Sequence, residues 1–140
     1  FDLDVNVSTL AKLIDNVEEF NSPSVVKVVF DYKNFALYFS RSPIPFVRDA
    51  KDEKEMLEKA DIYKHIGLYV YRKEYLLKFT KLEPTDLEQW EKLEQLRMLE
   101  NGFKIKIVDT EYDSFSVDTP EDLEKARKIY SKLKKIELAK

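Results

Sequence analysis

A single aspartate near the C-terminal end, Asp118, has the type and position to take part in chemistry. It directly precedes Thr119 and Pro120, which suit the cap and first position of a helix. The threonine hydroxyl can accept from an unpaired backbone N–H, and proline needs no N–H there. This capping pattern leaves the Asp118 carboxylate unexplained, at the kind of loop-to-helix junction where α/β folds tend to keep functional groups. An acid stabilised by the helix dipole is the competing interpretation.

A second group of chemically capable side chains follows a two-residue spacing. His65, Gly67 and Tyr69 alternate along a segment with strand periodicity, so they point to one face and could line one pocket. A buried core tyrosine and a strand-end histidine without a role are the alternatives. Because the chain has one histidine and no cysteine, its composition excludes histidine clusters, thiolate sites and disulfides.

The net charge and the distribution of apolar residues argue against two classes of binding partner, nucleic acids and membranes. The 140 residues carry a net charge of −3, and no basic run is interleaved with aromatic residues, so no nucleic-acid partner is expected. No apolar run approaches the ~20 residues of a membrane span, and the acidic N-terminus lacks a signal peptide's basic region, so no membrane partner is expected. The absence of cysteine fits a cytoplasmic location. Because the chain begins at Phe1 and not at Met, we expect a piece of a longer protein.

Strand and helix patterns alternate along most of the chain, so the predicted class is α/β with an antiparallel hairpin. The charged segment 48–61 is expected as a short exposed helix or a mobile loop. Strands are predicted at 5–10, 25–30, 35–40, 65–71 and 103–108, the second and third forming the hairpin. Helices are expected at 73–80, from 85 to a stop at 101–102, and at 120–138.

The middle helical region contains an irregularity. It opens at Thr85 with Glu88 three residues later, the spacing of a capping box. Its apolar residues recur every three positions, and three residues cover only about 300° of a helix, so a continuous helix would rotate them off one face. A bend or break is therefore predicted between Trp90 and Lys92. Glu88 and Glu91 are expected on a solvated helix face.

Four stretches resemble one family in their order and spacing, and together they extend over nearly the whole chain. This family is the 3-deoxy-manno-octulosonate (Kdo) cytidylyltransferases, or CMP-Kdo synthetases. The first and third stretches carry most of the specificity. The four are Tyr38–Pro45 (YFSRSPIP), His65–Tyr69 (HIGLY), Leu93–Arg97 (LEQLR) and Val117–Glu124 (VDTPEDLE).

The resemblance implies the C-terminal part of a Rossmann-like sugar nucleotidyltransferase fold, with a mixed sheet and an antiparallel hairpin. The enzyme it implies is a Mg2+-dependent, cytoplasmic homodimer that transfers CMP from CTP to the anomeric hydroxyl of Kdo. The products are pyrophosphate and CMP-Kdo for lipopolysaccharide synthesis. Residues 1–140 would be its sugar-binding and dimerisation portion. With Gly67 and Gly102 as its only glycines, the chain has no phosphate-cradling loop, so we expect it to be inactive without an N-terminal, nucleotide-binding half.

The same resemblance implies roles for six residues. Asp118 matches a catalytic, metal-binding aspartate, which suits Mg2+ because this ion takes carboxylate oxygens and keeps several waters. Arg41 matches a ligand of the Kdo carboxylate, which a guanidinium can hold bidentately; a surface ion pair is its alternative. The remaining matches, to groups that bind the sugar, are His65, Tyr69, Glu94 and Gln95. For the last two, a solvated helix face is the alternative.

Two other functions fit the sequence. The first is a cytidylyltransferase for another acidic sugar, of the sialic type or 8-amino-Kdo. The second is a non-catalytic interaction or dimerisation module. A Gly-rich loop encoded upstream of Phe1 would remove this second alternative, because such a loop is what a nucleotide-binding half requires.

Overall fold

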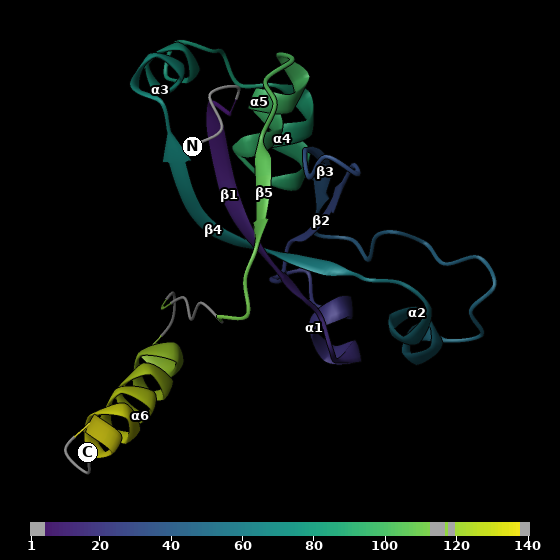
Figure 1. Cartoon of the computed structure of the whole chain (residues 1–140), viewed down its shortest axis with the longest axis vertical. Helices are drawn as coiled ribbons and strands as arrows, with labels where there is room; N and C mark the ends of the chain where they lie inside the picture. Colours follow the sequence, from purple (N-terminus) through teal and green to yellow (C-terminus); the bar gives the residue numbers. More distant parts are fainter. Residues whose placement is uncertain (1–4, 113–116, 118–119, 138–140) are drawn as a thin grey trace.

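A computed structural model describes residues 5–112, 117 and 120–137 of the chain. Its centre is a five-stranded mixed sheet in the order β3-β2-β4-β1-β5 (Figure 1). The α/β class and the mixed sheet with an antiparallel hairpin are confirmed. The elements are β1 (Val7–Leu13), α1 (Val17–Asn21), β2 (Lys27–Phe30), β3 (Ala36–Ser40), α2 (Glu53–Lys59), β4 (Tyr63–Tyr71), α3 (Lys73–Phe79), α4 (Asp86–Glu91), α5 (Gln95–Glu100), β5 (Lys106–Asp109) and α6 (Pro120–Glu137).

Strands β1 and β4 form the middle of the sheet. They pair antiparallel along their whole length, and β1 pairs in parallel with β5 on its other edge. A register shift after Thr9 leaves Gly67 and Leu68 without direct partners on β1. Because β2 pairs with β4 only near Tyr63 and Lys64, the rest of β4 is held mainly from the β1 side.

The predicted hairpin forms between β2 and β3. Asp31 closes its turn, because the carboxylate Oδ1 accepts from the backbone N–H groups of Lys33 (2.9 Å) and Phe35 (2.8 Å). Asn34 has a φ of 59°, a left-handed conformation that asparagine tolerates better than most residues. An isolated bridge from Phe35 to Lys106 then joins the start of β3 to β5.

The predicted break in the middle helical region is confirmed. α4 ends at Glu91, and Lys92 follows with a φ of 55°, which turns the chain into α5. The capping-box hydrogen bond to the Glu88 carboxylate forms as expected, because the Thr85 N–H donates to Glu88 Oε2 (3.2 Å). Gly102 has a φ of 77° just after α5, where glycine ends a helix at no steric cost.

Two groups of buried side chains fill the interior. The larger group packs the sheet against α4 and α5 and contains Val7, Ala11, Val28, Phe39, Leu93, Leu96, Met98, Ile105 and Ile107. The smaller group is Ile14, Phe20 and Ile62, which α1 and α2 cover. α1 was missed in the sequence, because five residues give too little periodicity to detect. α2 confirms a short exposed helix within the charged segment 48–61.

The C-terminal helix α6 extends over almost the whole predicted range, 120–138. It stands clear of the sheet in Figure 1, and Leu123, Ile129 and Tyr130 are exposed on it. Within the ranges that the structure describes, no helix is long and apolar enough to cross a membrane.

Candidate functional site

A cavity of about 410 Å3 lies between β4 and the turn that joins α4 to α5. Its lining residues are His65, Gly67, Tyr69, Tyr71, Phe79, Lys92, Leu93, Glu94, Gln95 and Met98. Four of the six residues singled out in the sequence therefore meet at one cavity, although two come from a strand and two from a helix start. We call this space the polar cavity.

His65 is held in its neutral form at the edge of the polar cavity. One ring nitrogen, Nε2, lies 2.8 Å from the Thr9 hydroxyl, and the ring packs edge-on against Phe39. Burial lowers the pKa of His65 to about 4, because a charged imidazolium would lose its hydration there. At neutral pH the side chain can donate one hydrogen bond and accept another, but carries no charge.

Tyr69 brings an unsatisfied hydroxyl to the same cavity. The hydroxyl oxygen is buried and makes no hydrogen bond of normal geometry within the described chain. The Thr9 side chain lies within weak hydrogen-bonding reach of Tyr69, but the Thr9 hydroxyl is already shared between His65 and the Ile66 and Leu68 carbonyls. Burial raises the pKa of Tyr69, so the group stays protonated. A buried hydroxyl without a partner is costly, and a polar ligand in the cavity would supply one.

Glu94 and Gln95 reach the polar cavity from the N-terminal end of α5, Glu94 as the residue before the helix and Gln95 as its first residue. Gln95 is buried, with 7% of its surface exposed, so it does not lie on the solvated helix face that was its alternative. Glu94 is exposed at the cavity rim. An amide and a carboxylate together offer donors and acceptors, which a polyhydroxylated ligand requires.

Arg41 is not among the residues that line the polar cavity. Its guanidinium donates to backbone carbonyls of Glu91 (2.7 Å), Pro23 (2.9 Å) and Lys92 (3.4 Å). Among the residues that the structure describes, its side chain therefore bonds backbone carbonyls and pairs with no surface carboxylate. Its assignment as a sugar-carboxylate ligand stays a prediction.

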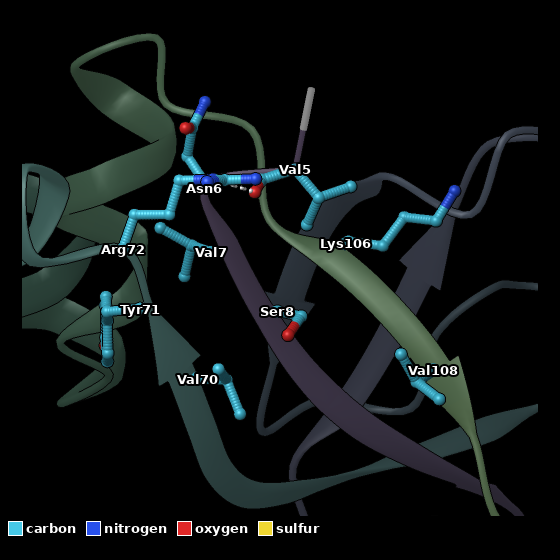
Figure 2. A pocket seen from close by; sticks show the side chains of 9 residues that line it. All are labelled: Val5, Asn6, Val7, Ser8, Val70, Tyr71, Arg72, Lys106 and Val108. Atoms are coloured by element: carbon cyan, nitrogen blue, oxygen red, sulfur yellow. Dashed lines mark hydrogen bonds between the residues drawn. The ribbon is translucent and has the colours of Figure 1, made fainter. Parts of the chain in front are cut away.

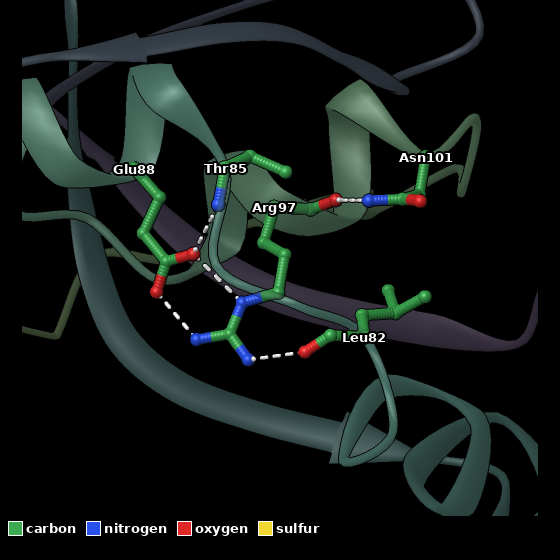
Figure 3. Close-up of polar contacts among 5 residues, drawn as sticks. All are labelled: Leu82, Thr85, Glu88, Arg97 and Asn101. Carbon is green, nitrogen blue, oxygen red and sulfur yellow. Dashed lines mark hydrogen bonds and ion pairs between the residues drawn. The ribbon is translucent and has the colours of Figure 1, made fainter.

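A part-buried ion pair joins α4 to α5 beside the polar cavity. Arg97 Nε donates to Glu88 Oε2 (2.7 Å), its Nη2 bonds the other carboxylate oxygen, and its Nη1 donates to Leu82 O (3.1 Å; Figure 3). The Arg97 hydrogen bonds hold the pKa of the Glu88 carboxyl below its usual range. The prediction that Glu88 lies on a solvated face is wrong, because its partner comes from the next helix.

Glu91 corrects the sequence interpretation in the same way. It is half-buried, and its carboxylate accepts from the Ser40 hydroxyl (2.6 Å) and from the Arg41 backbone N–H (2.9 Å). Both partners lie some fifty positions earlier in the chain, on β3 and just after it. No periodicity within the helix could have revealed them.

The predicted metal ligand, Asp118, lies outside the described residues. Among the residues that the structure does describe, no group of three or more His, Asp or Glu side chains could hold a metal ion. Mg2+ can be held by one or two carboxylates together with waters, so a metal cluster of that size is not a requirement for it.

Two polar residues of the cavity lining, Tyr71 and Lys92, were not identified from the sequence. Tyr71 continues the two-residue spacing of His65 and Tyr69, so the same periodicity could have identified it. Lys92 lies at the predicted helix break, but no sequence signal indicated that this break borders the cavity.

A second hollow, which we call the apolar groove, has a volume of about 430 Å3. It lies over β1, β4 and β5, where Val70 and Val108 project from the strands on either side of β1 (Figure 2). Both valines are exposed, at 63% and 46%. Arg72 closes one end, where its Nε donates to Val5 O (2.9 Å).

The fold and the polar cavity together define a class of protein. The chain belongs to the cytidylyltransferase family, whose sequence model matches residues 2–107. More particularly, it is 53% identical over 138 residues to the 3-deoxy-manno-octulosonate cytidylyltransferase of Geotalea uraniireducens (strain Rf4), an alignment of 96% of this chain and 54% of that protein. The protein of the same description from Geobacter sulfurreducens is 52% identical over 134 residues, or 93% of this chain and 52% of the relative.

A solved structure shows the same relationship in three dimensions. The structure of CMP:2-keto-3-deoxy-manno-octonic acid synthetase complexed with CTP matches with a TM-score of 0.83 and 40% identity. The match covers 94% of this chain and 51% of that one. The resemblance to CMP-Kdo synthetases is thus confirmed, and the chain spans about half the length of the curated relatives it matches.

Proposed function

We propose that this chain forms the sugar-binding part of a CMP-Kdo synthetase. The full-length protein would transfer CMP from CTP to the anomeric hydroxyl of Kdo and release pyrophosphate, as a step in lipopolysaccharide synthesis. Support comes from relatives that carry this activity in their names and from the CTP complex of the structural neighbour. The proposal includes a homodimer in the cytoplasm.

The observation that carries the proposal is the unpartnered Tyr69 hydroxyl in a cavity of sugar-sized volume. A hydroxyl of Kdo would give this group its missing hydrogen bond, and Gln95 and His65 would add donors and acceptors around it. The Glu94 carboxylate at the rim would accept from further sugar hydroxyls. These groups bind and orient the sugar so that its anomeric hydroxyl faces the nucleotide.

The negative charge of Kdo requires a cation near the polar cavity. Arg41 has five N–H donors, and three are directed at backbone carbonyls, so two remain to hold a carboxylate. We propose Arg41 for this role, because its Nη2 donates to the carbonyl of Lys92, which lines the cavity.

Asp118 is proposed to hold Mg2+ together with a carboxylate from the nucleotide-binding half. When bound, the ion would neutralise charge on the phosphates of CTP and orient the reacting groups. The contribution of this chain is one carboxylate, and the measurement that isolates it is Mg2+ binding by the Asp118→Asn protein in the absence of turnover.

Pyrophosphate release by the full-length gene product tests the function. With CTP and Mg2+ present, we expect release that depends on Kdo and is much slower with a sialic acid or with 8-amino-Kdo, because buried polar groups discriminate against a substituent they cannot pair. Faster turnover of either of those sugars would assign the protein to it. No release with any of the three would overturn the proposal.

The variant Tyr69→Phe sharpens this test. Because the Tyr69 hydroxyl is buried without a partner, its removal should not lower the free energy of unfolding and should raise it by about 1 kcal/mol. The KM for Kdo should rise about tenfold, since one hydrogen bond to the sugar is lost. An unchanged KM for Kdo would exclude Tyr69 from the site. Val70→Thr, on the opposite face of β4, is the matched control.

A further inference from the structure

Glu91 connects two parts of the molecule that are distant in the sequence. As the last residue of α4, it directs its carboxylate to the end of β3. Oε1 accepts from Ser40 Oγ (2.6 Å) and Oε2 accepts from the Arg41 backbone N–H (2.9 Å). Both carboxylate oxygens are thus engaged by a single two-residue segment of the sheet.

The segment that Glu91 holds is itself fixed from the other side. Lys27 is fully buried, and its ammonium group donates to Arg41 O (2.7 Å), Val25 O (2.6 Å) and Ser22 O (2.9 Å). Arg41 is therefore bonded through its N–H and its carbonyl at once. Attraction by Glu91 favours the charged form of Lys27 and partly offsets the cost of burying it, although burial still lowers the pKa of Lys27.

The Arg41 side chain in turn bonds the backbone at the end of α4. Its Nε donates to Glu91 O (2.7 Å) and its Nη2 to Lys92 O (3.4 Å). Side chain and backbone of Glu91 thus both bond the Ser40–Arg41 segment, which forms a closed set of contacts. We call this set the turn clamp.

The turn clamp lies next to the residues that present the polar cavity. Lys92 is in the left-handed conformation, and the Leu93 N–H reaches back to Glu88 O (3.2 Å). Glu94 and Gln95 follow at once as the start of α5. A non-glycine residue at positive φ is unfavourable in itself, so contacts on either side of Lys92 are needed to hold the turn.

We propose that Glu91 is a positioning residue for the polar cavity: the turn clamp holds the α4–α5 turn so that Glu94 and Gln95 face the sugar. This inference rests on the proposed function. Glu91 touches no substrate and acts through the residues that follow it. Its effect should therefore appear in the binding of Kdo and not in the binding of CTP.

The variant Glu91→Gln in the full-length protein tests the proposal. A glutamine oxygen can replace one acceptor, but its NH2 group cannot accept from the second donor, so one contact of the turn clamp is lost. We expect the KM for Kdo to rise about tenfold, with the KM for CTP and kcat changed by less than about threefold. Glu55→Gln is the matched control, because Glu55 is bonded within and just before α2, far from the polar cavity.

Substitutions of Ser40 keep the test decisive if Glu91→Gln does not fold. Ser40→Ala removes one donor to Glu91 and should raise the KM for Kdo about threefold, whereas Ser40→Thr retains the hydroxyl and should restore the wild-type value. A merely structural role would lower the melting temperature of Ser40→Ala and leave the ratio of the two KM values unchanged. Equal changes in KM for Kdo and for CTP, or no change in either, would overturn the proposal.

Hydrogen exchange separates this inference from the proposed function. If the wild-type protein does not turn over Kdo, the proposed function fails irrespective of Glu91. The turn clamp is then judged by the backbone amides of Leu93 and Leu96, whose hydrogen bonds lie in the turn. Exchange at both should accelerate several-fold in Glu91→Gln, and unchanged exchange would show that Glu91 does not hold the turn.

Discussion

The polar cavity and the apolar groove occupy opposite faces of the same strand and have nearly equal volumes, about 410 and 430 Å3. Tyr69 projects into the first, Val70 lines the second, and Tyr71 at the end of β4 borders both. The two-residue alternation of a strand explains the opposite directions of Tyr69 and Val70. Volume alone therefore does not distinguish a site from a bare surface.

The two hollows differ in how their walls are assembled. The sheet supplies the groove, whose apolar lining residues sit on adjacent strands (Figure 2). In the polar cavity, the second wall against β4 contains a helix break, and a part-buried ion pair and the turn clamp lie beside it. It also contains the unpartnered Tyr69 hydroxyl. A site for a polar ligand is recognised here by a buried polar group that has no hydrogen-bond partner in the fold.

The largest effect is expected from removing the ion pair that joins α4 to α5, the helices of the second wall of the polar cavity. Arg97→Met leaves the Glu88 carboxylate buried without its partner, and we expect it to lower the free energy of unfolding by about 3–5 kcal/mol. Chemical denaturation measures this loss. The double variant Glu88→Gln/Arg97→Met should recover part of it, because no unpaired charge is left. A loss below ~1 kcal/mol would show that the ion pair does not secure α4 against α5.

The next effect depends on pH and concerns the β4 wall. His65 has a folded-state pKa of about 4 against an ordinary value of 6.5, so between these values the unfolded chain binds a proton that the folded chain does not. The stability that neutral His65 contributes to the folded state is fully present above pH 6.5. It is lost as the pH falls toward 4, and the total loss is about 3 kcal/mol.

Denaturation at pH 7 and pH 4.5 checks the His65 prediction when wild type is compared with His65→Gln. The variant should lose less stability over this interval, because glutamine does not titrate. Equal losses in both proteins would mean that His65 titrates normally and is not desolvated by the cavity wall.

The smallest effect is expected on the groove side. Val70→Thr should change the free energy of unfolding by no more than ~0.5 kcal/mol, since the side chain is 63% exposed. The same substitution at Val28, which is 2% exposed, should cost about 1–3 kcal/mol because it buries a hydroxyl. A loss above ~1 kcal/mol for Val70→Thr in the full-length protein would show that the apolar groove is covered there.

Local patterns predicted the parts of the fold that depend on neighbouring residues. The hairpin followed from alternation around the polar turn at Asp31, and the helix break from an apolar spacing of three. The start of α6 followed from proline as first helical residue. The resemblance to a known family added six candidate site residues, and four of them line the polar cavity.

The partners of Glu88 and Glu91 were decided only by the tertiary structure. Within their helix both residues look like ordinary solvated acids, and the sequence interpretation placed them there. The fold instead directs one to Arg97 and the other to Ser40 and Arg41. Such contacts join segments whose distance in the chain carries no periodic signal, so they arise only when the sheet and helices have packed. The sequence by itself thus determined which polar groups are present near the polar cavity, and the packing determined which of them hold its walls and which stay open to a ligand.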